Sequence, residues 1–390
     1  MPLDISASPG ERSGLGCVCR EPGKVAVEQL RFLAPGPGEV RLEVHACGMC
    51  HSDLSVVNRR IPFPLPNVLG HEGAGVVEAV GEGVTDWKVG DRAILTMVLP
   101  CNRCADCLCS KPSLCKKRGQ HMPVGRVLDT SGKSLTAMGG LGCMAEYAVV
   151  SQVALIHVQE DMPLEKGALV SCGVTTGVGA VMNCAKVPPG SSCCVIGCGG
   201  VGLSAIQGAR ISGASQIIAV DTMPSKLTAA KQFGATHCVN AKTVDNVVKE
   251  IARLSGGGTD YSFEAIGLPQ TAEQAIEAVR AGGTAVIVGV AGQKDRAQLK
   301  LAKINFLETV VKGSFMGSSV PMHFVPMLCN LYKKGDLLLD EFVSRYYHIQ
   351  EVCTAFDDLA SGVGLRGVVV MHHLQHLAEQ STLQAHTSRL

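Results

Sequence analysis

Two groups of metal-ligating residues stand out in the chain, and they differ in spacing. The first is a run of four cysteines in the segment PCNRCADCLCSKPSLC: Cys101, Cys104, Cys107 and Cys115. Four clustered thiolates can complete a tetrahedral shell around zinc, so this C-x2-C-x2-C-x7-C run predicts a closed structural metal site. Cys109 also lies in the run, and we interpret it as a spare thiol rather than a competing ligand.

The second group is dispersed along the chain and consists of Cys50, His71 and Cys172. Three protein ligands leave one position of a zinc ion open, which a catalytic zinc requires. Each of these residues is a weak signal by itself. A lone buried cysteine is usually a small apolar filler, and a lone histidine on a strand is more often a satisfied core residue.

A glycine-rich turn further along the chain predicts a dinucleotide-binding site. The pattern G-x-G-x-x-G is met by the run Gly197-Cys198-Gly199-Gly200-Val201-Gly202. The run follows a short apolar strand and opens a helix, so its glycines permit a tight turn and let a pyrophosphate approach backbone N–H groups at the positive helix end. An ordinary strand–helix turn is the alternative interpretation.

Asp221 lies at the end of the next predicted strand, 19 residues after Gly202. A carboxylate at this place accepts hydrogen bonds from the adenosine ribose hydroxyls and repels a 2′-phosphate, so it favours NAD over NADP. Asp221 could also serve as a helix N-cap, and the two roles are compatible.

The elements that must position these residues differ between the two parts of the chain. Residues 24–45 alternate apolar and polar side chains around a PGPG turn, and Gly and Val dominate 68–98, which predicts short strands in a β-rich, barrel-like domain. From about residue 174, strands alternate strictly with helices, which is typical of a doubly wound parallel sheet. The alternation ends near 310–315, and RGVVVMHH is the last predicted strand.

Length and composition narrow the class of protein. A chain of 390 residues suggests two domains, and a net charge of +1 favours neither nucleic acid nor an anionic membrane as a partner. The N-terminal segment has no signal-peptide core, and no uninterrupted apolar run approaches the roughly 18 residues of a spanning helix. We therefore expect a cytoplasmic protein whose 18 cysteines are thiols and metal ligands rather than disulfides.

Taken together, these motifs resemble those of the zinc-dependent medium-chain alcohol dehydrogenases over roughly residues 22–371. The resemblance implies an α/β fold with a GroES-like β-rich catalytic domain at residues 1–173 and 317–371 and a Rossmann domain with a doubly wound parallel sheet at 174–316. The tail 372–390 has no counterpart in the family pattern, and we expect a loose or helical extension there rather than a metal site. A homodimer, or else a tetramer, is the expected assembly.

The same resemblance implies how two zinc ions are bound in each chain. The ligands of the catalytic zinc are Cys50, His71 and Cys172, and the four clustered cysteines bind a structural zinc. Glu72 lies just behind the catalytic zinc and can ligate it transiently. Asp53 bonds the free ring nitrogen of His71 and fixes its tautomer.

The resemblance also assigns residues to proton transfer and to NAD. Ser52 contacts the substrate oxygen and begins the proton relay. Residues expected near the cofactor, besides the glycine turn and Asp221, are His51, Arg366, Thr176 and Lys226. In liver-type members a histidine stands at the position of Ser55 and an arginine at that of His51, so we expect a shortened relay and a pH-sensitive pyrophosphate contact.

The expected reaction is the reversible oxidation of a primary alcohol to its aldehyde, in which zinc polarises the alcohol oxygen and hydride passes to NAD. Alignment to the family puts Met97, Met138 and Ile61 on the substrate pocket, and methionines make a pliable apolar wall. A medium, aryl or allylic alcohol is therefore expected in preference to ethanol.

Several alternatives stay open at this point. One is an S-(hydroxymethyl)glutathione dehydrogenase, and another is a medium-chain enzyme that acts on a polyol or on threonine. A catalytically silent NAD-binding protein would be expected to lack Cys50 or Cys172, and both are present. A metal-storage or zinc-ribbon module is disfavoured by the intact glycine fingerprint.

Overall fold

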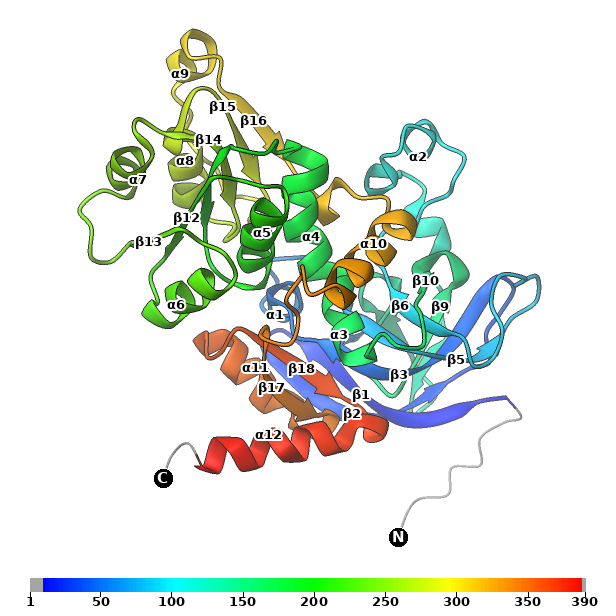
Figure 1. Cartoon of the computed structure of the whole chain (residues 1–390). Coiled ribbons are helices and arrows are strands. Elements are labelled where there is room, and N and C mark those ends of the chain that lie inside the picture. The colour runs from blue at the N-terminus through cyan, green and yellow to red at the C-terminus, as the bar shows by residue number, and fades with distance from the viewer. Residues whose placement is uncertain (1–9, 388–390) are drawn as a thin grey trace. The chain divides into compact units, whose positions relative to one another are not determined.

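A computed structural model describes residues 10–387 of the chain, with side chains described as far as residue 381 (Figure 1). Contacts between residues divide it into two compact units. The first unit comprises the chain up to Cys172, Pro321–Cys329 and the chain from Leu339 onwards, and the second comprises Gly173–Val320 and Asn330–Leu338. The domain ranges expected from the sequence stay a prediction.

The first unit is built from short strands. A closed barrel runs in the order β1 (Arg12–Glu21), β2 (Lys24–Phe32), β7 (Val127–Asp129), β8 (Ser134–Ala137) and β4 (Asn67–Val68). A seven-stranded sheet runs in the order β10 (Leu155–His157), β6 (Arg92–Leu95), β5 (Gly73–Val80), β3 (Glu39–Gly48), β18 (Arg366–Val370) and β17 (Val343–His348), and β9 (Tyr147–Ser151) also pairs with β3.

Strand β3 shows why this sequence forms a sheet with one buried face. Val40, Leu42, Val44 and Ala46 are fully buried at every second position, and side chains two residues apart point to the same face of a strand. Val40, Leu42 and Val44 belong to a core cluster that also contains the only tryptophan of the chain, Trp87. The antiparallel neighbour β5 is glycine-rich, and a Cβ on Gly75 would meet the backbone oxygen of Glu43 at 2.2 Å.

The second unit is a six-stranded sheet whose paired strands all run parallel. Its order is β13 (His237–Asn240), β12 (Gln216–Asp221), β11 (Ser192–Ile196), β14 (Thr259–Glu264), β15 (Val279–Ile287) and β16 (Val310–Gly313). In chain order this is 3-2-1-4-5-6, the arrangement of a doubly wound Rossmann sheet. The fold class expected from the sequence is confirmed.

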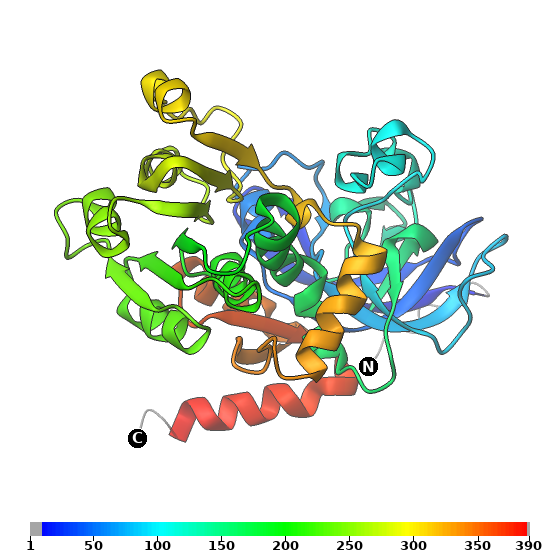
Figure 2. The same cartoon turned by 45° about the horizontal axis from the view of Figure 1, so that its top comes forward.

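Helices connect these parallel strands, and they are coloured green to yellow in Figure 2. They are α5 (Gly200–Ile211), α6 (Pro224–Gln232), α7 (Val247–Ser255), α8 (Pro269–Ala278) and α9 (Leu301–Phe306). Right-handed crossovers place α5 and α6 on one face of the sheet and α7 and α8 on the other, and α7 and α8 contact each other. The reversal of strand order between β11 and β14 opens the crevice in which such sheets bind ligands.

The remaining helices are α1 (His51–Val57), α2 (Ala105–Leu108), α3 (Leu164–Leu169), α4 (Thr175–Gly179), α10 (Pro321–Lys333), α11 (Val352–Ser361) and α12 (Gln375–Thr387). A π-helical turn, Val170–Val174, joins α3 to α4. The continuous helix Leu164–Ala185 is long and apolar enough to cross a membrane by length and composition alone, but 83% of its apolar window is buried inside the protein. Glu165 and Lys166 are its only charged residues and lie in its first turn.

Candidate metal centres and dinucleotide site

Three segments of the first unit bring one candidate metal centre together. Cys50 precedes α1 directly, His71 and Glu72 lie between β4 and β5, and Cys172 lies in the π-helical turn. One ligand atom from each of these four residues lies within 4.8 Å of the others, and all four are buried. π-Helical turns occur often at functional sites because the extra residue redirects a side chain.

Asp53, in the first turn of α1, supports this centre from behind. Its Oδ1 accepts a hydrogen bond of 2.8 Å from the backbone N–H of Gly70, and its Oδ2 lies 3.1 Å from Nδ1 of His71. Among the described residues, neither Oδ2 of Asp53 nor Nδ1 of His71 has a partner that meets hydrogen-bond criteria. Because the two atoms are close enough for a hydrogen bond, it is the angle of this contact that departs from the ideal. Gly70 has φ +95°, and a Cβ there would meet the backbone nitrogen of Met144 at 2.2 Å, so only glycine permits this approach.

Glu72 is paired with Arg366, a residue that the family resemblance led us to expect near the cofactor. Arg366, the first residue of β18, makes an ion pair with Glu72, and both side chains are almost fully buried. Gly48 leaves room for this pair, because a Cβ there would meet Oε2 of Glu72 at 2.2 Å. Nothing in the local sequence of Arg366 reveals the pair, because the two residues lie 294 positions apart.

Electrostatics prepare the centre for a cation. A hydrogen bond from the Cys172 thiol lowers the pKa of Cys50 well below its usual value, and the same bond raises the pKa of Cys172. Burial raises the pKa of Glu72 to about 7, against the opposing charge of Arg366. Burial alone would lower the pKa of His71, but the charges of Asp53 and the two cysteines outweigh it and raise that pKa.

The donor set fits a zinc ion. Nε2 of His71 is buried and has no hydrogen-bond partner among the residues the structure describes. One ring nitrogen of His71 lies in the same compact group as two sulfur atoms, and Nδ1 is the nitrogen that faces Asp53. A divalent cation would satisfy Nε2 and both thiolates at once, and two cysteines with one histidine are ligands that zinc accepts. Asp53 would then be the outer partner that sets the ring orientation of His71.

The clustered cysteines form a second candidate centre in the cyan loop around α2 in Figure 1. One sulfur from each of the four lies within 4.8 Å of the others, and Sγ of Cys104 is 3.9 Å from Sγ of Cys115. Asn102 adopts a left-handed conformation with φ 55° in the turn between the first two cysteines, which asparagine tolerates better than most residues. A backbone hydrogen bond from Arg103 lowers the pKa of Cys101 to about 6.

Cys109 lies outside this group. It follows α2 and is exposed, whereas Cys115 is buried. The structure therefore brings together the four cysteines that the spacing selected. Four thiolates in this arrangement fit a structural zinc ion.

The glycine-rich turn of the second unit lies between β11 and α5, as the motif requires. Gly197 has φ +98°, and a Cβ on Gly202 would meet the backbone oxygen of Gly197 at 1.7 Å, so both positions need glycine. A Cβ on Gly199 would meet nothing within 4 Å, which leaves the turn open where α5 begins. An open glycine turn at a helix N-terminus fits a pyrophosphate group.

Asp221 is the last residue of β12 and is hydrogen-bonded to this turn. Its Oδ2 accepts the backbone N–H of Cys198 at 2.8 Å, and its Oδ1 accepts that of Met223 at 2.9 Å. The carboxylate is half-buried, and each oxygen keeps lone pairs for another donor.

The remaining predicted site residues have simple positions in the structure. In the first unit, Ser52 is half-buried in α1 and His51 is exposed at its start. In the second, Val201 lies in the first turn of α5 and Lys226 is half-buried on α6. Thr176 is buried on α4, and its hydroxyl lies 3.8 Å from Sδ of Met316.

The expected pocket residues all lie in the first unit. Met138 belongs to its main core cluster, and Ile61 and Met97 pack against that cluster and are partly buried. Their position on a substrate pocket stays a prediction.

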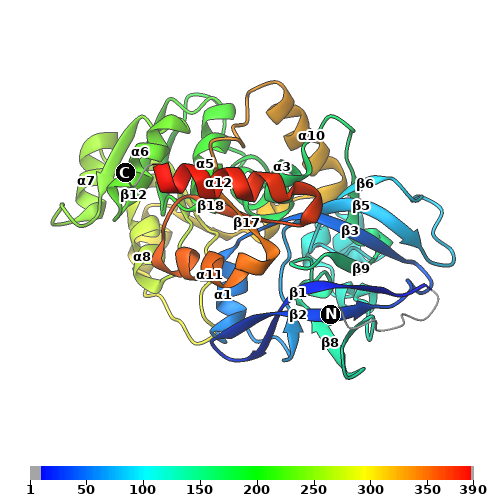
Figure 3. The same ribbon diagram turned by 90° about the horizontal axis from the view of Figure 1, so that it is seen from below.

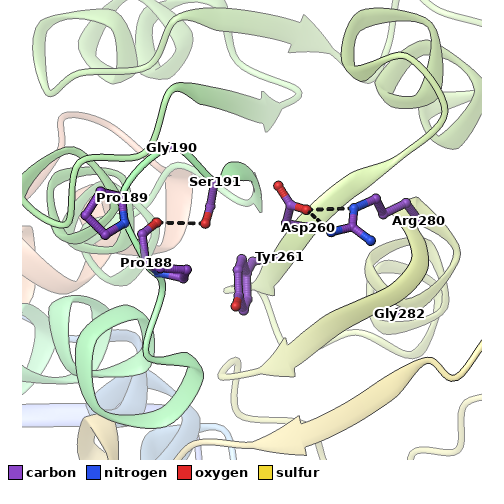
Figure 4. A pocket seen from close by; sticks show the side chains of 8 residues that line it. All are labelled: Pro188, Pro189, Gly190, Ser191, Asp260, Tyr261, Arg280 and Gly282. Carbon is purple, nitrogen blue, oxygen red and sulfur yellow. Dashed lines mark hydrogen bonds and ion pairs between the residues drawn. The ribbon is translucent and has the colours of Figure 1, made fainter.

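A shallow pocket of the second unit lies away from the glycine turn, near the amino ends of β11 and β14 (Figure 4). Its lining includes Ser191, Tyr261 and the ion pair between Asp260 and Arg280, whose charges already compensate each other. We assign it no ligand.

Comparisons with known proteins agree with this geometry. Residues 36–160 match the family model described as alcohol dehydrogenase GroES-like domain, and residues 200–331 match that described as zinc-binding dehydrogenase. The chain is 39% identical over 356 residues to the alcohol dehydrogenase class-3 of Drosophila melanogaster. The matched region covers 88% of this chain and 94% of that protein.

Solved structures give the same result. A zinc-binding domain alcohol dehydrogenase protein from Burkholderia ambifaria is 37% identical with a TM-score of 0.88, and the match covers 92% of this chain and 99% of that chain. The benzyl alcohol dehydrogenase from Acinetobacter calcoaceticus is 34% identical with a TM-score of 0.86 over the same shares of the two chains.

Proposed function

Because the chain belongs to the zinc-dependent medium-chain alcohol dehydrogenases, we propose that it oxidises a primary alcohol reversibly to the aldehyde with NAD, using two zinc ions per chain. The observation that carries this proposal is the buried group of Cys50, His71, Glu72 and Cys172. It offers a zinc ion two thiolates and an imidazole, and it keeps a carboxylate nearby. When bound, zinc supplies a Lewis acid for the alcohol oxygen, and NAD supplies the hydride acceptor.

The residues of the chain have distinct tasks in this proposal. Asp53 holds Nδ1 of His71, so that Nε2 stays available as a ligand. Arg366 restrains Glu72 and stabilises its negative charge. Ser52 follows Cys50 by two residues and is the group that receives the proton of the alcohol. Ser55, one turn further on α1, cannot serve as a base as a histidine would.

We further propose that Asp221 selects NAD. Its carboxylate is fixed by the N–H groups of Cys198 and Met223 next to the open glycine turn, where it can accept the ribose hydroxyls but would repel a 2′-phosphate. Asp221→Gly should weaken NAD use and raise the kcat/KM ratio of NADP to NAD at least tenfold, and Asp245→Gly is an exposed control. Equal use of NADP and NAD by the wild type would contradict the assignment.

For the substrate we propose a medium, aryl or allylic primary alcohol. Ile61, Met97 and Met138 are the apolar side chains assigned to the substrate, and the benzyl alcohol dehydrogenase is a close structural relative at 34% identity. We also propose a cytoplasmic homodimer.

The decisive experiment measures NADH formation over a panel that contains ethanol, hexanol, benzyl alcohol, cinnamyl alcohol, sorbitol, threonine and S-(hydroxymethyl)glutathione. The metal content of the same sample should be close to two zinc ions per chain. Highest kcat/KM on benzyl or cinnamyl alcohol supports the proposal. Preference for the glutathione adduct or for a polyol would replace the substrate assignment, and full activity without zinc would reject the mechanism.

A further inference from the structure

A cluster of histidines and carboxylates lies in the first unit, apart from both cysteine centres. Glu43 and His45 alternate along β3 with the buried residues Leu42, Val44 and Ala46, so they share the opposite face of the strand. The backbone N–H of Met371 bonds the carbonyl of His45 at 3.0 Å. This bond brings the short 3₁₀ turn His372–Leu374, which follows β18, over that face.

The side chains of this cluster converge on one carboxylate oxygen. Nε2 of His373 lies 2.7 Å from Oε1 of Glu43, and Nε2 of His372 lies 3.9 Å from the same oxygen. One ligand atom from each of these three residues lies within 4.8 Å of the others. The side chains are 27–51% exposed, so an ion can reach them from solvent.

We propose that Glu43, His372 and His373 bind a divalent transition-metal ion, with zinc as the first candidate, and that this ion fastens the C-terminal helix to the sheet. Two ligands bonded to a tetrahedral zinc ion at its usual bond lengths lie about 3.4 Å apart. The observed separations of 2.7 and 3.9 Å bracket that value, so small side-chain rotations complete the geometry. Water fills the fourth position, as the exposure of the cluster allows.

The surroundings of the three ligands support a metal site over a simple salt bridge. Nδ1 of His372 faces Oε1 of Glu146 at 3.9 Å, which is where a metal-bound imidazole finds a carboxylate for its other ring nitrogen. The ring of His373 stacks on that of His45 with centroids 4.7 Å apart and an angle of 15°, which restrains its orientation. Glu43 and Glu146 together would balance the two positive charges of the ion.

The position of the cluster gives the ion a structural consequence. Helix α12 begins two residues after His373 and contacts β17 and β18, along which it is drawn in red in Figure 3. Ala378 of this helix is buried, and the hydroxyl of Ser381 on the same helix accepts the backbone N–H of Tyr346 at 3.2 Å. A metal bridge from Glu43 to the first turn would therefore hold the amino end of this helix in place.

Zinc binding to the full-length, untagged protein tests the proposal. Equilibrium dialysis against free Zn²⁺ should give one zinc ion per chain more than the number bound by the two centres that contain cysteine ligands. Glu43→Gln and the double variant His372→Gln/His373→Gln should each weaken this additional binding at least tenfold. His376→Gln is the matched control, because His376 lies in the first turn of α12, close in sequence to the two histidines, is exposed and stands outside the cluster.

Hydrogen exchange gives a second, independent measurement. Added Zn²⁺ should slow amide exchange in residues 375–387 of the wild type and of His376→Gln, but not in Glu43→Gln. The proposal is overturned if the wild type takes up no additional zinc. It is also overturned if His376→Gln loses binding while Glu43→Gln keeps it, because the ion would then bind histidines of the C-terminal segment alone, without Glu43 of the sheet.

Discussion

At the scale of single residues, the proposed catalytic centre depends on side chains that bind no metal themselves. Asp53 and Arg366 are buried charged groups, and each faces one oppositely charged or ionisable partner, His71 and Glu72 respectively. A buried charge is costly unless it is paired, so these residues are expected to be as sensitive to substitution as the ligands. Gly48 contributes by absence of a side chain, because a Cβ there would displace Glu72.

The serines of α1 lead to a prediction about proton transfer. Ser52→Ala should lower kcat by on the order of 10²-fold, in the range of a lost proton-transfer group. Ser55→Ala is the matched control on the same helix, and it should change kcat little because water can replace its hydroxyl. Steady-state kinetics with a benzylic alcohol compares the two. A collapse of turnover in Ser55→Ala at unchanged NAD affinity would show that the relay extends beyond Ser52.

His45 leads to a prediction about stability and pH. Burial lowers the pKa of His45 from 6.5 to about 4. The charges of His373, Arg92 and His372 act in the same direction, and that of Glu43 opposes them. The folded protein therefore binds fewer protons than the unfolded chain between these two values. The stability from neutral His45 is complete above pH 6.5 and is lost as the pH falls towards 4.

Denaturant unfolding at pH 7.5 and 5.0, without added metal, measures this effect. Acidification should cost His45→Gln less stability than it costs the wild type, because glutamine does not titrate. The exposed His323→Gln should behave as the wild type does. Equal losses in all three proteins would mean that His45 is not the group responsible.

At the scale of elements, the cysteine loop provides the clearest comparison. Cys104→Ser removes one of four converging thiolates, and metal binding at such sites contributes directly to folding. We expect its melting temperature to fall by about 5 °C or more. Cys109→Ser, an exposed thiol on the same loop, should leave both the melting temperature and the zinc content unchanged. An unaffected Cys104→Ser would mean that the loop holds no structural zinc or that Cys109 replaces the lost ligand.

Much of the parallel sheet could be predicted because each strand and helix carries its own periodic pattern. The strand predicted to end at Asp221 is β12, and the helix predicted after the glycine turn is α5. The long helix Leu164–Ala185 escaped prediction because its glycines and β-branched residues disfavour helix in isolation. Burial against surrounding elements overrides that preference. The helix α2 has only four residues, too few to show a helical period in the sequence.

The metal ligands could be proposed from spacing and family resemblance, but their supporting contacts could not. Arg366 was expected near the cofactor, and its pair with Glu72 becomes visible only when β18 lies beside β3. For the same reason the tail was expected to be a plain extension. His373 meets Glu43 across 330 positions of sequence, and no local pattern connects the two. Long-range pairs of this kind require the register of the sheet.

At the scale of the whole molecule, each compact unit contains a different part of the proposed chemistry. All the proposed metal ligands lie in the first unit, and the glycine turn with Asp221 lies in the second. The second unit also has an open sheet edge at β16, where Val310 and Val311 are 41% and 39% exposed. The neighbouring Leu301 and Phe306 of α9 are more exposed still. An uncovered apolar edge strand is a template for pairing with another chain, and this is the support for the proposed homodimer.

A charge placed on this edge should separate the dimer. If β16 pairs with the same strand of a second copy around a twofold axis, Val311→Arg brings two like charges together, since such an interface repeats each residue. We expect the wild type to sediment as a dimer at micromolar concentration, and Val311→Arg to raise the dissociation constant at least tenfold. Val124→Arg is the control, because Val124 is an exposed valine of the first unit, at 86% exposure, away from this edge. Analytical ultracentrifugation over a concentration series distinguishes the outcomes, and a Val311→Arg protein that remains dimeric would locate the interface on another surface.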